Sequence, residues 1–148
     1  MKNEFWVGEK MDDYILLIIL IMASMIDIKK KIIPNRLLLA GLCAWIFLLA
    51  IGYVQLTSDK VIAVAAVSSL LILLYIATNK NIGFGDIKLL ILMCIYIELT
   101  ELLGILIVAT IVCGLVSAVL LVNKKVDKST PIPFAPFLLI GSFLVLVM

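Results

Sequence analysis

The sequence contains no histidine, and its 148 residues include only 15% charged side chains and three cysteines. Without histidine, the chain lacks the side chain most often used as a general base and as a metal ligand. Cys43, Cys94 and Cys113 each lie within an apolar run, and no Cys-x-x-Cys pair occurs. These cysteines are typical of small core residues rather than of a zinc site or a disulfide. We therefore expect no metal and no cofactor.

Apolar residues are abundant instead. They make up 65% of the chain, and the mean hydropathy is +1.29. A soluble domain is closer to half apolar, so lipid is the expected solvent for most of this surface. Residues 1–10 form a polar N-terminal tail without the basic region and cleavage site of a signal peptide. We expect residues 1–148 to form a single integral membrane domain whose first apolar run is retained.

Six apolar runs follow one another along the chain, and most reach the roughly 18–20 residues that a helix needs to cross the hydrocarbon core. The runs cover about 11–28, 36–54, 61–78, 82–97, 102–122 and 131–148. Backbone groups in lipid must bond within the protein, so these runs are expected to be helices. The predicted fold class is an all-α integral membrane protein with six transmembrane helices.

Basic residues predict the orientation of these helices. Nine of the twelve lysines and arginines fall on one side of the expected bundle: Lys29, Lys30, Lys31, Arg36, Lys80, Lys88, Lys124, Lys125 and Lys128. The other side carries Lys2, Lys10 and Lys60. Because cytoplasmic connections are enriched in basic residues, the first set is predicted to face the cytoplasm. Both termini then lie on the extracytoplasmic side.

Two aspartates stand at the edges of apolar runs. Asp27 ends the first run, and Asp86 opens the fourth. Each has an ordinary structural explanation: Asp86 as a first-turn carboxylate, and Asp27 as a partner of Lys30 or Lys31. However, the predicted topology places both at the same depth near the cytoplasmic surface. Acidic groups within membrane segments are usually functional, so we interpret them as a pair.

A pair of close carboxyl groups supplies both an acid and a base. Two such groups cannot easily both ionise in a site of low dielectric constant, so one keeps a proton and the pair titrates as a unit. The ionised member can take a proton from a water that attacks a peptide carbonyl, while the other protonates the carbonyl oxygen. This chemistry needs neither histidine nor metal.

Glycine and proline surround the two aspartates. Gly83 and Gly85 precede Asp86, and they either form a simple turn into the helix or leave room for an extended peptide. Pro34 is expected to end the first helix, and Asn35 is a candidate N-cap of the second.

The segment PIPFAPFLLIG carries three more prolines, Pro131, Pro133 and Pro136, at the entrance to the last run. They predict an irregular backbone, which is either a structural helix start or the lining of a cavity.

Three segments together resemble the type IV prepilin peptidase family of aspartic membrane peptidases. They are DIKKKIIPN, GFGDIKLL and IPFAPFLLIG, and they span nearly the whole chain in that order. The resemblance implies that Asp27 and Asp86 are the catalytic pair and that Gly83 and Gly85 are the motif glycines. It implies supporting roles for four further motif positions: Asn35, Lys88, Pro133 and Pro136.

The resemblance also implies a substrate and a location. Family members remove a short basic leader from prepilins and pseudopilins at the cytoplasmic face of the bacterial inner membrane, in type IV pilus assembly and protein secretion. No nucleic acid partner is expected, and the oligomeric state is left open. Large members carry an additional cysteine-rich region and methylate the new N-terminus. Nothing in this sequence corresponds to that region, so the resemblance is to a compact, peptidase-only member.

Two functions from other classes are alternatives. A small proton or cation transporter could use Asp27 and Asp86 as ion ligands, but it would be expected to carry more polar residues in the middle of its helices. A structural assembly subunit would need neither aspartate. The hydrolase is the favoured interpretation.

Overall fold

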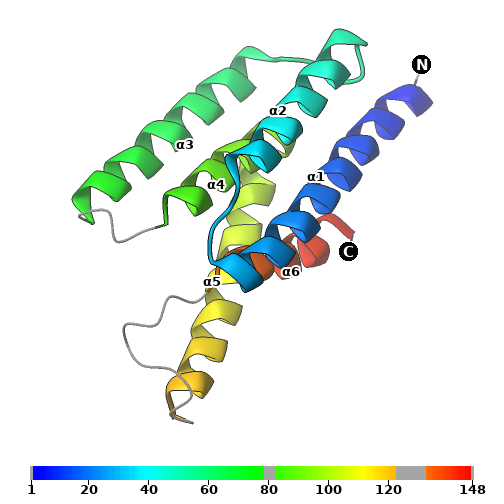
Figure 1. Ribbon diagram of the computed structural model, residues 1–148. Coiled ribbons are helices and arrows are strands. Elements are labelled where there is room, and N and C mark those ends of the chain that lie inside the picture. Colours follow the sequence, from blue (N-terminus) through cyan, green and yellow to red (C-terminus); the bar gives the residue numbers. More distant parts are fainter. Residues whose placement is uncertain (1, 79–82, 123–132, 148) are drawn as a thin grey trace.

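The computed structural model describes residues 2–78, 83–122 and 133–147 of the chain (Figure 1). Helices account for all regular structure in these ranges, which confirms the predicted all-α class. Their bounds are α1 Lys2–Lys30, α2 Asn35–Ala50, α3 Ser58–Ala77, α4 Phe84–Tyr96, α5 Leu99–Val122 and α6 Ala135–Val147. Lys80, Lys124, Lys125, Lys128 and Pro131, which the topology and motif predictions used, lie outside the described residues.

Helix α1 begins earlier than the sequence suggested. We expected a polar tail over residues 1–10, whereas α1 is helical from Lys2 onward. The tail contains no proline, and a helix extends at little cost once its apolar part has formed. The polar residues therefore continue α1 by more than two turns instead of forming a separate tail.

The helices differ in how well their lengths suit a membrane span. By length and composition, α3 and α5 are long and apolar enough to cross a membrane, while α2 and α6 are shorter apolar helices. Both α4 and α6 contain 13 residues, which at 1.5 Å per residue gives a length of about 20 Å. The full set of six spans stays a prediction.

The connection between α1 and α2 is extended. Helix α1 ends at Lys30, and Lys31 adopts a left-handed φ of 52° while its N–H donates to the carbonyl oxygen of Asp27 at 2.8 Å. The helix therefore ends four residues before Pro34, not at the proline. Pro34 itself, with φ −71° and ψ 132°, occupies the N-cap position of α2. The prediction that Asn35 is the N-cap was wrong, because Asn35 is the first helical residue.

Helix α6 packs against both α1 and α5 (Figure 1). The contact with α5 is close at Gly141, where an added Cβ would lie 2.7 Å from the carbonyl oxygen of Ile105. Fully buried side chains, among them Leu20, Met93 and Leu138, fill the core between the helices. This packing fixes the start of α6 beside the end of α1, which is where Asp27 lies.

Candidate active site

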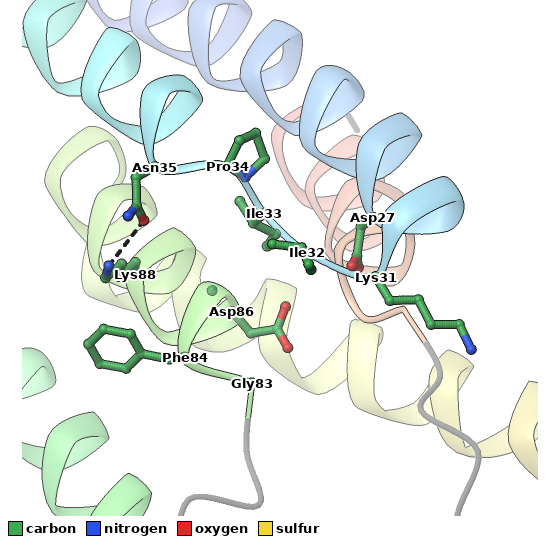
Figure 2. A pocket seen from close by; sticks show the side chains of 11 residues that line it. Asp27, Lys31, Ile32, Ile33, Pro34, Asn35, Gly83, Phe84, Asp86 and Lys88 are labelled. Atoms are coloured by element: carbon green, nitrogen blue, oxygen red, sulfur yellow. Dashed lines mark hydrogen bonds between the residues drawn. The ribbon is translucent and has the colours of Figure 1, made fainter.

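A cavity of about 460 Å³ opens where α1 ends and α4 begins (Figure 2). Its walls come from the last turn of α1, the extended connection to α2, the start of α2 and the first turn of α4. The lining residues are Asp27, Lys31, Ile32, Ile33, Pro34, Asn35, Gly83, Phe84, Gly85, Asp86 and Lys88. The structure thus brings Asp27 and Asp86 together on one cavity, although they are far apart in the sequence.

Asp27 is deeply buried, with 5% of its surface exposed. It lies in the last turn of α1, where the helix dipole disfavours a negative charge. Its Oδ2 accepts a hydrogen bond of 3.2 Å from the backbone N–H of Ala135. Ala135 is the first residue of α6, and the N-terminus of a helix carries a partial positive charge that favours an anion. The partial positive charge at the start of α6 therefore offsets the unfavourable effect of the α1 dipole on the Asp27 carboxylate.

Asp86 lies in the first turn of α4 and is half-buried. Its own helix favours a negative charge at this position. The carboxylate extends into the cavity from the α4 side, while Asp27 faces the same space from α1 (Figure 2). Within the described residues, no hydrogen bond joins the two carboxyl groups. They face each other across a cavity into which a water and a peptide bond could enter.

The motif glycines make room for atoms of this chain. An added Cβ at Gly83 would lie 2.8 Å from Oδ2 of Asp86, and one at Gly85 would lie 3.2 Å from Cβ of Ile33. The second position also approaches the backbone nitrogen of Ile33 at 3.5 Å. Sequence reasoning offered a turn or the approach of a peptide. The structure shows Gly83 as the N-cap that turns the chain into α4 and leaves space for the Asp86 carboxylate. Gly85 allows the extended connection to pack on α4, and the approach of a peptide stays a prediction.

Lys88 and Asn35 form the polar edge of the cavity. The Nζ of Lys88 donates to Oδ1 of Asn35 at 3.0 Å and lies 4.5 Å from the centre of the Phe84 ring (Figure 2). Phe84 in turn packs on Tyr75 of α3, with 5.2 Å between the ring centres. The Asn35 side chain therefore bridges to α4 instead of capping α2. Phe84 lies between the two glycines, and the sequence predicted no role for it.

Pro133 and Pro136, for which the resemblance implied supporting roles, do not line the cavity. Pro133 and Pro136 are half-buried and flank Phe134 and Ala135 at the start of α6. The group that contacts the site from this segment is the backbone N–H of Ala135, which sequence reasoning missed. A backbone donor is present at every non-proline residue, so no sequence signal distinguishes this one. In the ranges that the structure describes, no group of three or more cysteine, aspartate or glutamate side chains could hold a metal ion.

A profile described as the type IV leader peptidase family matches residues 14–119, which is well over half of the chain. The chain belongs to this family. The matched range includes both Asp27 and Asp86, together with Asn35 and Lys88. It ends before Pro133 and Pro136, so the family match does not extend to the segment at the start of α6.

Curated relatives in this family share the name prepilin leader peptidase/N-methyltransferase. The chain is 28% identical to the protein from Stutzerimonas stutzeri over 133 residues, covering 86% of this chain and 46% of that protein. It is 32% identical over 139 residues to the protein from Pectobacterium carotovorum subsp. carotovorum, covering 90% and 50%. The chain thus spans about half the length of the curated relatives it matches. No solved structure gives a significant match.

Proposed function

We propose that this chain is a membrane aspartic endopeptidase that removes the short basic leader of type IV prepilins or pseudopilins. The observation that carries the proposal is that Asp27 and Asp86 face one cavity. Membership of the type IV leader peptidase family supports the choice of a prepilin leader over other peptides. The same membership favours a peptidase over a proton or cation transporter. We propose leader removal only and assign no N-methyl transfer to this chain.

In the proposed reaction, the two carboxyl groups share one proton, because two negative charges in so confined a site would repel each other. The ionised carboxylate takes a proton from a water molecule, whose oxygen attacks the carbonyl carbon of the scissile peptide. The protonated partner donates to the carbonyl oxygen. When the tetrahedral intermediate collapses, the carbon–nitrogen bond breaks and the leaving nitrogen takes the proton that the first carboxyl group had accepted from water. A hydroxyl of the intermediate returns a proton to the partner as the new carboxyl group forms. Two new chain ends result, and the pair returns to its starting state.

Access of a peptide to this pair requires an opening at the membrane surface. We propose that the cavity faces the cytoplasm of a bacterial inner membrane, with six spans and both termini outside. The distribution of lysine and arginine supports this orientation. A cavity of about 460 Å³ falls within the range of about 300–1,000 Å³ that is usual for ligand sites, so it offers space for a few residues of an extended peptide.

Coexpression with a prepilin tests the proposal. The wild-type chain should shorten the prepilin by its leader, which is visible as a faster band on a gel. Asp27→Asn and Asp86→Asn should each leave the precursor uncut, because either change removes one of the two titrating groups. Asp59→Asn, which alters an exposed aspartate of α3, serves as the matched control and should process normally. Processing by either dyad variant at the wild-type rate would refute the assignment.

A further inference from the structure

The start of α6 has no side-chain cap of its own. Phe134 precedes the helix, and its carbonyl oxygen accepts the N–H groups of Phe137 and Leu138 at 3.0 and 3.2 Å. Its apolar side chain cannot accept a hydrogen bond, and Pro136 carries no N–H. The N–H of Ala135 is thus a first-turn donor that needs a partner. Because Ala135 is fully buried, water is not the partner expected at this place.

Asp27 supplies that partner from another helix. Its Oδ2 accepts the Ala135 N–H at 3.2 Å across 108 positions of sequence. A buried donor left without an acceptor costs about 1–3 kcal/mol. The hydrogen bond to Asp27 avoids this cost for the Ala135 N–H and also gives the buried carboxyl group a donor. The contact occupies one oxygen of Asp27. Among the described residues, its Oδ1 has no hydrogen-bond partner, which leaves this oxygen for the cavity.

The two aspartates therefore differ in how they are held. Asp27 is bonded to a backbone group that the close packing of α5 and α6 keeps in place. No hydrogen bond to the Asp86 carboxylate occurs within the part of the chain that the structure describes. A side chain that must present one oxygen to a reacting water gains from having its other oxygen fixed, because misplacement by about 1 Å can lower a rate about a hundredfold.

We propose that the backbone N–H of Ala135 is the positioning group for Asp27, so that the first turn of α6 sets the orientation of one member of the dyad. This inference rests on the proposed peptidase function of Asp27 and Asp86. It also gives the proline segment a role, since Pro133 and Pro136 flank the bonded amide and lack N–H groups that could compete for the same carboxylate. If this hydrogen bond served only to cap α6, its loss would not lower the rate of cleavage.

Removal of the donor is the first test. Ala135→Pro deletes the N–H at the first helical position, which is where proline is best tolerated in a helix. We expect kcat for prepilin cleavage to fall at least about tenfold, which corresponds to about 1.4 kcal/mol in the barrier, while KM changes little because substrate binding is not altered. Ala135→Gly retains the donor and is expected to recover most of the lost kcat relative to Ala135→Pro.

Ser58→Pro is the matched control for introducing a proline. It places proline at the first position of α3, after Thr57, whose backbone is extended with φ −83° and ψ 152°. An extended residue is compatible with a following proline, so cleavage should stay at the wild-type rate. A wild-type kcat in Ala135→Pro would overturn the proposal.

Hydrogen–deuterium exchange tests the contact without any substrate. Asp27→Ala removes the acceptor and should speed exchange of the Ala135 amide, whereas Asp27→Asn keeps a side-chain oxygen and should preserve its protection. Unchanged exchange in Asp27→Ala would overturn the proposal. If Asp27→Asn still cleaved prepilin at the wild-type rate, the peptidase role of Asp27 would fail whatever the exchange result. The two failures are therefore distinguishable.

Discussion

Asp27 and Asp86 reach the cavity from opposite ends of their helices. Asp86 stands at the start of α4, where its own helix dipole favours a carboxylate. Asp27 stands at the end of α1, where the dipole opposes it, and the N-terminus of α6 compensates through the Ala135 N–H. The pair is thus supported by two helix N-termini that converge on one site.

At Gly85, the addition of a single methyl group should alter the geometry of the cavity. Gly85→Ala would place a Cβ 3.2 Å from Cβ of Ile33 and 3.5 Å from its backbone nitrogen. The extended connection would have to move away from α4, which alters the distance between the walls that carry Asp27 and Asp86. We expect the rate of leader removal, measured with purified enzyme and prepilin, to fall at least about tenfold.

Gly114→Ala is the control for this substitution. Gly114 lies within α5, and a Cβ added there would meet no atom within 4 Å. It should leave activity unchanged, and the higher helix propensity of alanine should stabilise the fold slightly. Equal activity of the Gly85 and Gly114 variants would show that contact with Ile33 does not shape the site.

At the scale of residues, the sequence predicted those features that side chains determine. The Gly-x-Gly-Asp element and a second aspartate predicted Asp27 and Asp86 as a pair, and both line the cavity, while their catalytic role stays a prediction. The Asn35 cap was predicted wrongly because Lys88, remote in sequence, engages its side chain. The Ala135 donor could not be predicted, because a backbone group acquires its role only from the packing of α6 on α1.

At the scale of elements, side-chain hydrogen bonds hold α4 near both of its ends. Near the cavity, Lys88 bonds Asn35 at the start of α2. At the far end, the Tyr96 hydroxyl donates to the carbonyl oxygen of Gly41 at 2.6 Å, and Nζ of Lys60 donates to the carbonyl oxygen of Tyr96 at 3.3 Å. These bonds link the short α4 to α2 and α3, so the helix that carries Asp86 is fixed in position.

Tyr96→Phe tests the bond at the far end of α4. The tyrosine side chain is buried, with 3% of its surface exposed, and the substitution removes one hydrogen bond while keeping the ring. We expect the free energy of unfolding in detergent, measured by denaturant titration, to fall by about 1 kcal/mol. Tyr53→Phe, at a residue that is 49% exposed, should change it by less than about 0.5 kcal/mol. Equal effects of the two substitutions would contradict a stabilising role of this bond.

The elements themselves were predictable from apolar runs, and all six predicted helices exist. Their ends were less predictable. Helix α1 extends through the polar residues from Lys2, because polarity alone does not stop a helix, and it ends at a left-handed Lys31 before the expected proline. Helices α4 and α6 are shorter than the runs that predicted them. Their apolar runs continue into segments that are turns or lie outside the described residues.

At the scale of the whole molecule, the outer surface is apolar. Helix α3 buries none of its residues, and large side chains such as Ile62, Leu70 and Leu73 are exposed along it. On α5, Ile107, Ile111 and Leu115 are likewise exposed. Such surfaces are expected where lipid replaces water as the solvent, since burial inside the protein is not needed there. The sequence predicted this from composition alone.

The predicted orientation in the membrane can be measured by cysteine labelling. In a background without Cys43, Cys94 and Cys113, we introduce Lys30→Cys or Lys60→Cys and treat intact cells with an impermeant thiol reagent. The excess of basic residues near Lys30 predicts that a cysteine at position 30 is labelled only after the membrane is permeabilised. A cysteine at position 60 should be labelled in intact cells. Labelling of position 60 only from the cytoplasmic side would contradict the topology that places both aspartates at the cytoplasmic face.

In the proposed mechanism, Asp27 and Asp86 act together as one catalytic unit. The most direct measurement is the initial rate of leader removal by purified wild-type, Asp27→Asn, Asp86→Asn and double-variant proteins in liposomes. Residues that act as a unit are strongly non-additive, so each single variant should already fall to the background rate of the double variant. Single variants that keep partial activity, with losses that multiply in the double variant, would contradict the account.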